Sequence, residues 1–176
     1  MQTQYSLFDR RAEKEMQQYC LDHGISLTCY GTLADGFFAK RYIGRLRESI
    51  RPETRPQVKY LQVIEDSLGW DGYQKLLGLL KKIADHHGVG IPLAAARWVL
   101  DQPAVAAIII GVRNSRHVED NAKIFSFDLT PQEKEKLRNF ISGYSNLKGE
   151  PFELERTIGS KYRNIMHMNI NEEKQQ

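Results

Sequence analysis

The sequence has little cysteine and no long hydrophobic run. Its two cysteines, Cys20 and Cys29, are too few for a disulfide framework, and both lie among apolar residues. We therefore expect buried thiols in a reducing compartment. No stretch approaches the roughly 18 apolar residues of a membrane span, and residues 1–4 lack the regions of a signal peptide. These absences predict a cytoplasmic protein without a membrane partner.

Several cofactor and metal motifs are missing as well. No G-x-G-x-x-G, H-E-x-x-H or C-x-x-C occurs in the sequence. Residues 31–36 have the glycine spacing of a P-loop, but Phe37 and Phe38 stand where its lysine and hydroxyl should be. His86 and His87 are adjacent in a predicted helix, where neighbouring side chains point to different faces. The sequence therefore predicts neither a P-loop nor a metal site.

One segment, residues 40–59, is rich in lysine and arginine. Such a segment could attract phosphates or RNA. Only Tyr42 and Tyr60 lie near it as stacking partners for bases, and the net charge of the whole chain is only +3. A solvated loop face is therefore the favoured interpretation, and no nucleic-acid partner is expected.

Strand-like and helix-like patterns alternate along the chain, which indicates an α/β protein with a parallel sheet. The apolar run 104–110 is unbroken, which is typical of a strand buried on both faces. Thr130 to Glu133 form a capping box with proline at the first helical position. The expected strands are residues 2–7, 25–29 and 104–110, and the expected helices are 11–23, 58–68, 73–84, 92–100, 115–124 and 131–142.

The segment 108–121 carries the most chemical information. A buried strand leads to Gly111, then to Arg113, then to the start of a helix. Helix N-termini accept phosphate through unpaired N–H groups, and a guanidinium can grip phosphate oxygens with a planar fork of donors. From these residues alone, a phosphate site and a plain strand–helix turn both remain, with the turn favoured.

Four segments together resemble the aldo-keto reductase family. They are similar to the family's sixth barrel strand, the end of its seventh strand, the helix before its eighth strand, and its eighth strand with the adenosine-phosphate site. In that order they are residues 2–10, 28–36, 92–100 and 108–121, and residues 153–156 are similar to tails in part of the family. The resemblance implies a partial (β/α)8 TIM barrel, about strands 6–8 with their helices, in residues 1–143, followed by a C-terminal extension, 144–176.

The resemblance also implies contacts with NADP(H). Gln2 would contact the nicotinamide carboxamide, and Tyr30 would stack on the nicotinamide ring, unless it is only a strand-end aromatic packed on the barrel. Thr32, Leu33 and Asp35 would lie in the loop that approaches the pyrophosphate. That loop departs from the family at residues 31–32, where Gly-Thr replaces the commoner Ser-Pro.

The adenosine half of the cofactor is assigned to the second segment. By position, Gly111 and Arg113 would face the 2′-phosphate, and Asn121 with Asp120 would meet the adenine. His117 stands where relatives often have Gln or Arg. We count it among the cofactor-binding candidates, with its role open.

The family's catalytic Asp, Tyr, Lys and His come from earlier barrel strands, so Tyr5, Tyr30 and Lys40 are not those residues. We therefore expect no catalytic residue here, an incomplete NADP(H) site, and no activity from this chain alone. A small-molecule carbonyl substrate is expected only if a complementing N-terminal chain completes the barrel. Open sheet edges also predict self-association. The alternatives are a non-catalytic nucleotide- or protein-binding module and a degenerate fragment without activity.

Overall fold

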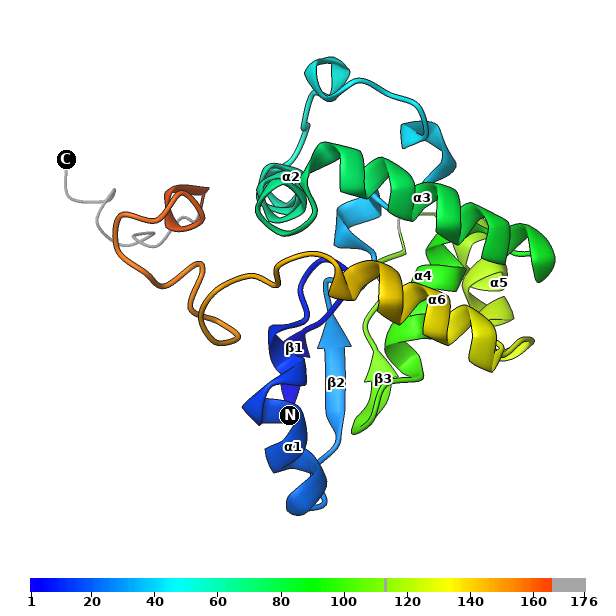
Figure 1. Cartoon of the computed structure of the whole chain (residues 1–176), viewed down its shortest axis with the longest axis horizontal. Coiled ribbons are helices and arrows are strands. Elements are labelled where there is room, and N and C mark those ends of the chain that lie inside the picture. Colours follow the sequence, from blue (N-terminus) through cyan, green and yellow to red (C-terminus); the bar gives the residue numbers. More distant parts are fainter. Residues whose placement is uncertain (113, 166–176) are drawn as a thin grey trace.

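The computed structural model describes residues 1–112 and 114–165, and in them three parallel strands form one sheet with helices beside it (Figure 1). The sheet order β1-β2-β3 follows the chain. The predicted α/β class with a parallel sheet is therefore confirmed. The strands are β1 (Gln2–Gln4), β2 (Leu27–Tyr30) and β3 (Val105–Ile108); the helices are α1 (Glu15–Asp22), α2 (Arg55–Ser67), α3 (Gly69–His86), α4 (Ile91–Leu100), α5 (Arg116–Ala122) and α6 (Pro131–Ser142).

One face of the sheet is covered and the other is more open. In the central strand β2, Leu27 and Cys29 are fully buried, whereas Thr28 and Tyr30, on the opposite face, are partly exposed. The predicted burial of both cysteine thiols is confirmed. The core on the covered side includes the helical face that the spacing predicted for α3, namely Tyr73, Leu76, Leu77, Leu80, Ile83 and Ala84.

The prediction that residues 104–110 form a strand buried on both faces is wrong. The strand covers only Val105–Ile108, and Ala106, Ala107 and Ile109 are exposed. Helix α4 packs against β3 from one side, and β3 lies at the edge of the sheet. An apolar run needs cover on both sides to be fully buried, and the described part of the chain supplies it on one side only.

The first predicted helix also differs in its details. A 3-10 turn over Arg11–Glu13 precedes α1, which begins only at Glu15. Cys20 is buried as the spacing predicted, but Tyr19 is 54% exposed and stacks on His23 instead of entering the core. Ala12 is buried and Met16 packs against the core, as the spacing also predicted, so only Tyr19 is wrongly assigned to the inner face.

The segment that follows α6 packs against the rest of the protein. The backbone N–H of Arg10 donates to Asn146 Oδ1 at 3.0 Å, and Leu147 and Tyr162 are buried. The Tyr162 hydroxyl donates to Asp66 Oδ2 on α2 at 2.6 Å. Residues 144–165 therefore tie the N-terminal segment to α2.

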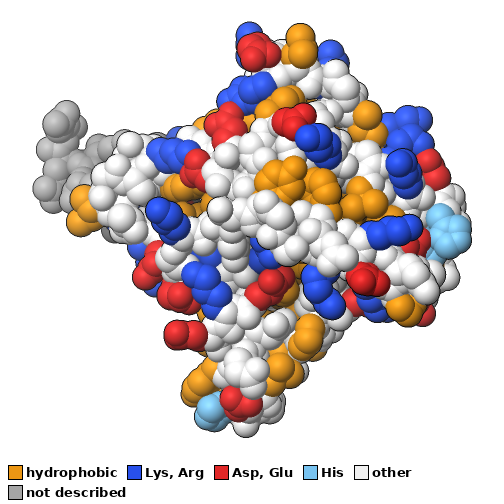
Figure 2. Space-filling model, viewed as in Figure 1, with side chains coloured by type: hydrophobic (Ala, Val, Ile, Leu, Met, Phe, Trp, Pro, Cys, Tyr) orange, Lys and Arg blue, Asp and Glu red, His pale blue; other side chains and the backbone are white. Residues whose placement is uncertain are grey.

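Charges of both signs share the visible surface (Figure 2), and the described helices are not of the membrane-spanning kind. Figure 2 shows positive and negative side chains interspersed over the visible face, not gathered into one basic patch. Among residues 1–112 and 114–165, no helix is both long enough and apolar enough to cross a membrane.

The capping box at the start of α6 is confirmed. Thr130 Oγ1 accepts from the Glu133 N–H at 3.2 Å, and Glu133 Oε2 accepts from the Thr130 N–H at 2.8 Å. Because Thr130→Ala removes one of these bonds, we expect it to lower the free energy of unfolding by about 1 kcal/mol. Urea denaturation against the exposed control Ser145→Ala measures this, and equal midpoints for the two variants would contradict it.

Candidate functional site

The carboxyl ends of all three strands meet at one edge of the sheet. Gln4 pairs with Tyr30, and Cys29 pairs with Ile108. Just beyond the strands, the Tyr5 N–H donates to the Tyr30 carbonyl at 3.1 Å, and the Ile109 N–H donates to the Cys29 carbonyl at 2.7 Å. The segments that follow β1, β2 and β3 therefore start side by side.

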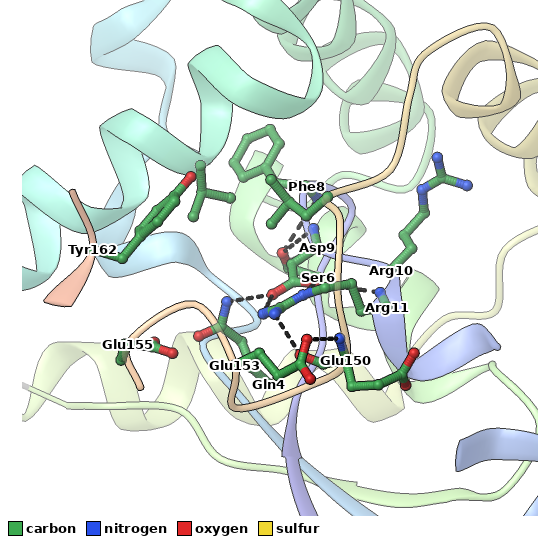
Figure 3. A network of polar contacts seen from close by, with 12 residues as sticks. Gln4, Ser6, Phe8, Asp9, Arg10, Arg11, Glu150, Glu153, Glu155 and Tyr162 are labelled. Atoms are coloured by element: carbon green, nitrogen blue, oxygen red, sulfur yellow. Dashed lines mark hydrogen bonds and ion pairs between the residues drawn. The ribbon is translucent and has the colours of Figure 1, made fainter. Parts of the chain in front are cut away.

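A buried ion pair stands at the end of β1 (Figure 3). Arg11 Nε donates to Asp9 Oδ1 at 2.8 Å and Nη2 donates to Oδ2 at 2.7 Å, and both side chains are almost fully buried. Gln4 Nε2 donates to the same carboxylate at 2.6 Å, and Arg11 Nη1 donates to the Glu150 carbonyl at 2.7 Å. This network joins the strand end to the C-terminal segment.

Lys59, on α2, extends the network toward Tyr30. Its ammonium contacts both Gln4 Oε1 and the Glu155 carboxylate. Although burial alone would raise the pKa of Glu155, the bond and charge of Lys59 outweigh it and lower the pKa. Tyr30 is half-buried, and its pKa is raised by burial and then by the negative charges of Glu155 and Asp9. Tyr30 is therefore held in its neutral, hydroxyl-bearing form.

Glycine is required at the first residue after β2. Gly31 has a φ of +68°, and a Cβ there would lie 2.1 Å from the Tyr60 hydroxyl. Tyr60 thus fills the space that a serine side chain would need. This explains why the chain departs from the Ser-Pro pattern at this position.

The loop after β2 has an unusual backbone. Ala34 and Asp35 both have positive φ values, 48° and 50°. The Thr54 hydroxyl donates to Asp35 Oδ2 at 2.9 Å and also accepts from the Gln57 N–H, so the loop is attached to the start of α2. Left-handed residues other than glycine are strained and occur where a ligand is clamped or the chain switches conformation.

A small apolar cluster joins this loop to the segment after β3. Leu33 and Ile110 both pack against a cluster formed by Leu93, Ala96 and Ile124. Two of the segments named by the sequence, 32–36 and 108–121, are therefore brought together. Neither the spacing of these residues nor their chemistry had predicted this contact.

The remaining candidates lie on the surface or outside the described residues. Gly111, His117 and Asp120 are exposed and Asn121 is half-buried. The Asp120 carboxylate is paired with Lys123 at 2.7 Å, and this bond lowers its pKa. The candidate Arg113 lies outside the described residues.

Gln2 and Tyr30 lie on the same face of the sheet but at different positions along the strand direction. Gln2 is exposed at the start of β1, opposite Thr28, and Tyr30 lies opposite Gln4 at the far end. Alternation along the strands places all four side chains on the same face. Sequence reasoning missed Gln4, although its position two residues after Gln2 was a usable signal.

A cleft of about 320 Å³ opens between the loop 37–53 and the start of α2. Arg41, Arg45 and Arg51 line it, together with Phe37, which directly follows the strained loop. Part of the basic segment that we interpreted as a solvated loop face therefore gathers around one cavity.

The interpretation that His86 and His87 point to different faces is wrong in its geometry. Helix α3 ends at His86, and His87 is its C-cap. His86 Nδ1 lies 2.9 Å from Glu133 Oε1, and His87 Nε2 lies 2.8 Å from Glu133 Oε2. The two rings reach the same residue because each contacts a different oxygen of the Glu133 carboxylate.

Comparison with known proteins shows the family. The model of the aldo/keto reductase family matches residues 1–142, and the chain belongs to this family. It is 26% identical over 137 residues to versiconal hemiacetal acetate reductase of Aspergillus parasiticus. The matched residues make up 78% of this chain and 38% of that protein. The chain is 30% identical over 144 residues to a probable voltage-gated potassium channel subunit beta of Arabidopsis thaliana, covering 80% of this chain and 43% of that one.

Solved structures agree on the fold. Glycerol dehydrogenase from Gluconobacter oxydans is similar with a TM-score of 0.67 and 24% identity, over 85% of this chain and 44% of that chain. An aldo/keto reductase from Klebsiella pneumoniae, in complex with NADP and acetate, gives a TM-score of 0.53 and 19% identity, over 85% and 40%. The chain thus spans less than half the length of these relatives.

Proposed function

We propose that this chain forms the part of an NADP(H)-dependent aldo-keto reductase that runs from about the sixth barrel strand onward. Such an enzyme moves hydride between the cofactor and a carbonyl compound. The observation that carries the proposal is the meeting of segments 32–36 and 108–121 beside the carboxyl ends of the strands, in a chain of this family. Barrel enzymes of this kind build their sites at that end of the strands.

The loop 32–36 is suited to a phosphate group by its surroundings. Its strained backbone is fixed to the start of α2 through Asp35 and Thr54. The arginines of the neighbouring cleft supply positive charge next to it. A solved relative in complex with NADP supports the choice of cofactor. We therefore assign Thr32, Leu33 and Asp35 to the pyrophosphate side of the cofactor.

The nicotinamide would lie over the open face of the sheet. Tyr30 is half-buried there, with its polar neighbours already hydrogen-bonded to one another. Its neutral side chain suits a stacking role, and Gln2 on the same face suits the carboxamide. Carbonyl reduction also needs a general acid to protonate the oxygen as hydride arrives. We propose that this acid belongs to barrel strands that this chain does not supply.

Cofactor preference tests the proposal directly. Arg113 would pair with the 2′-phosphate that distinguishes NADPH from NADH, and a charge-assisted bond contributes about 1.5–3 kcal/mol. We therefore expect Arg113→Ala to weaken NADPH binding about tenfold or more in calorimetry and to leave NADH binding unchanged. The exposed control Arg138→Ala should change neither. Equal losses for both cofactors would mean that Arg113 does not read the phosphate.

One observation favours a second candidate, a non-catalytic module that binds a nucleotide or a partner protein. The open side of β3 presents Ala106, Ala107 and Ile109 to solvent. A partner chain could cover this surface without any reductase chemistry. Sequencing the DNA directly upstream separates the candidates: an in-frame continuation that encodes the other strands supports the reductase, and a promoter at Met1 supports the module.

A further inference from the structure

Two histidines and a glutamate meet where the end of α3 lies beside the start of α6. One ring nitrogen of His86, one ring nitrogen of His87 and one carboxylate oxygen of Glu133 all lie within 4.8 Å of one another. The side chains of His87 and Glu133 are only 13% and 10% exposed, and that of His86 is 64% exposed. The cluster is therefore anchored on its inner side and open to solvent on its outer side.

The three side chains are held in different ways. Glu133 is fixed by the capping box, because its Oε2 accepts from the Thr130 N–H. His87 packs its ring against Phe127, with ring centroids 5.0 Å apart. His86 is the exposed member of the three. Two ligands are thus preorganised, and the third can adjust.

These distances are close to those of a coordination sphere. Zn²⁺ binds imidazole nitrogen and carboxylate oxygen at about 2.0–2.2 Å in tetrahedral sites, which places neighbouring ligand atoms about 3.4 Å apart. His86 contacts Glu133 Oε1 at 2.9 Å and His87 contacts Glu133 Oε2 at 2.8 Å, so a metal held by one of these oxygens would lengthen the contact on its side to about 3.4 Å. The separation of the two imidazole nitrogens can close by rotation of the exposed His86 ring.

We propose that His86, His87 and Glu133 form a Zn²⁺ site that links the end of α3 to the start of α6. Two imidazoles and one carboxylate are a known zinc donor set, and the fourth position is open to water. Each neutral ring binds through the nitrogen that faces Glu133 and carries its proton on the outer nitrogen. Hard cations such as Ca²⁺ and Mg²⁺ prefer sites made of oxygen ligands and are not expected here.

Binding is tested on the full chain, purified without a histidine tag. Calorimetry with Zn²⁺ should give one site per chain, and Co²⁺ should give the visible absorption of a tetrahedral ion without a thiolate band, since both cysteines are buried. His87→Gln and Glu133→Gln should each weaken Zn²⁺ binding at least fivefold. Glutamine at 133 can keep the capping box, so loss of the helix cap does not explain the effect.

His23→Gln is the matched control, because His23 is an exposed histidine at the end of α1 and belongs to neither α3 nor α6. It should bind Zn²⁺ as the unchanged chain does. Excess Zn²⁺ should also raise the melting temperature of the unchanged chain and of His23→Gln, but not of the other two variants. Absence of binding by the unchanged chain, or a loss below fivefold in either His87→Gln or Glu133→Gln, overturns the proposal.

Discussion

Replacing Asp9 by Asn is expected to lower the free energy of unfolding by about 3–5 kcal/mol, since it leaves the Arg11 guanidinium buried without its counter-charge. Both side chains are almost fully buried, and the carboxylate accepts two bonds from the Arg11 guanidinium, one from the Arg11 backbone N–H and one from Gln4. Asparagine keeps the shape of the side chain but not its charge. Urea denaturation at a fixed low protein concentration, followed by the fluorescence of the buried Trp98 and the partly buried Trp70, measures the loss.

Asp85→Asn is the control for this prediction. Asp85 forms an exposed pair with Lys81 on α3, and exposed pairs contribute little to stability. The double variant Asp9→Asn/Arg11→Met should lose less than the sum of its single variants, because the two residues share one interaction. A loss below about 1 kcal/mol for Asp9→Asn would show that the buried pair does not hold the N-terminal segment in place.

The chain by itself is expected to leave NADPH unoxidised in the presence of reactive aldehydes or quinones, and to associate with itself. Under the proposed function, the general acid that activity requires belongs to barrel strands that this chain does not supply. Association follows from the sheet, in which β1 and β3 are both edge strands and β3 exposes apolar side chains. Co-expression with a chain that supplies the first five strands should suppress association and restore reductase activity. Size-exclusion chromatography with light scattering and an NADPH absorbance assay measure the two effects.

A variant at the sheet edge separates association from misfolding. Ala107→Lys places a charge on the exposed side of β3, which should reduce self-association without altering the helix-covered core. A compact monomer with a sharp thermal transition and no binding of a hydrophobic dye would contradict the predicted association. Turnover at rates usual for the family would contradict the absence of an acid, and Tyr30 would then be the first residue to replace.

The candidate site could be predicted from the sequence only in part. The segments around Tyr30 and Gly111 were found because each combines a strand end, a glycine and a family pattern. The charged groups that act on Tyr30, Glu155 and Asp9, were not predicted, and neither was the contact of Lys59 with Glu155. Lys59 and Glu155 come from distant parts of the chain, and no spacing rule connects them. The convergence of His86 and His87 was missed for a related reason, since it depends on where α3 ends and on the position of α6.

The sequence by itself determined the alternation of strands and helices, the inner face of α3 and the cap of α6, because these depend on side chains a few residues apart. Only the tertiary structure decided which strand became an edge. The run 104–110 is apolar enough for a buried strand. Its burial depends on which elements pack on each side of it, and the residues of the run do not determine that. Likewise, Gly31 is a glycine because Tyr60 lies against it, and that contact exists only after α2 packs at the strand ends.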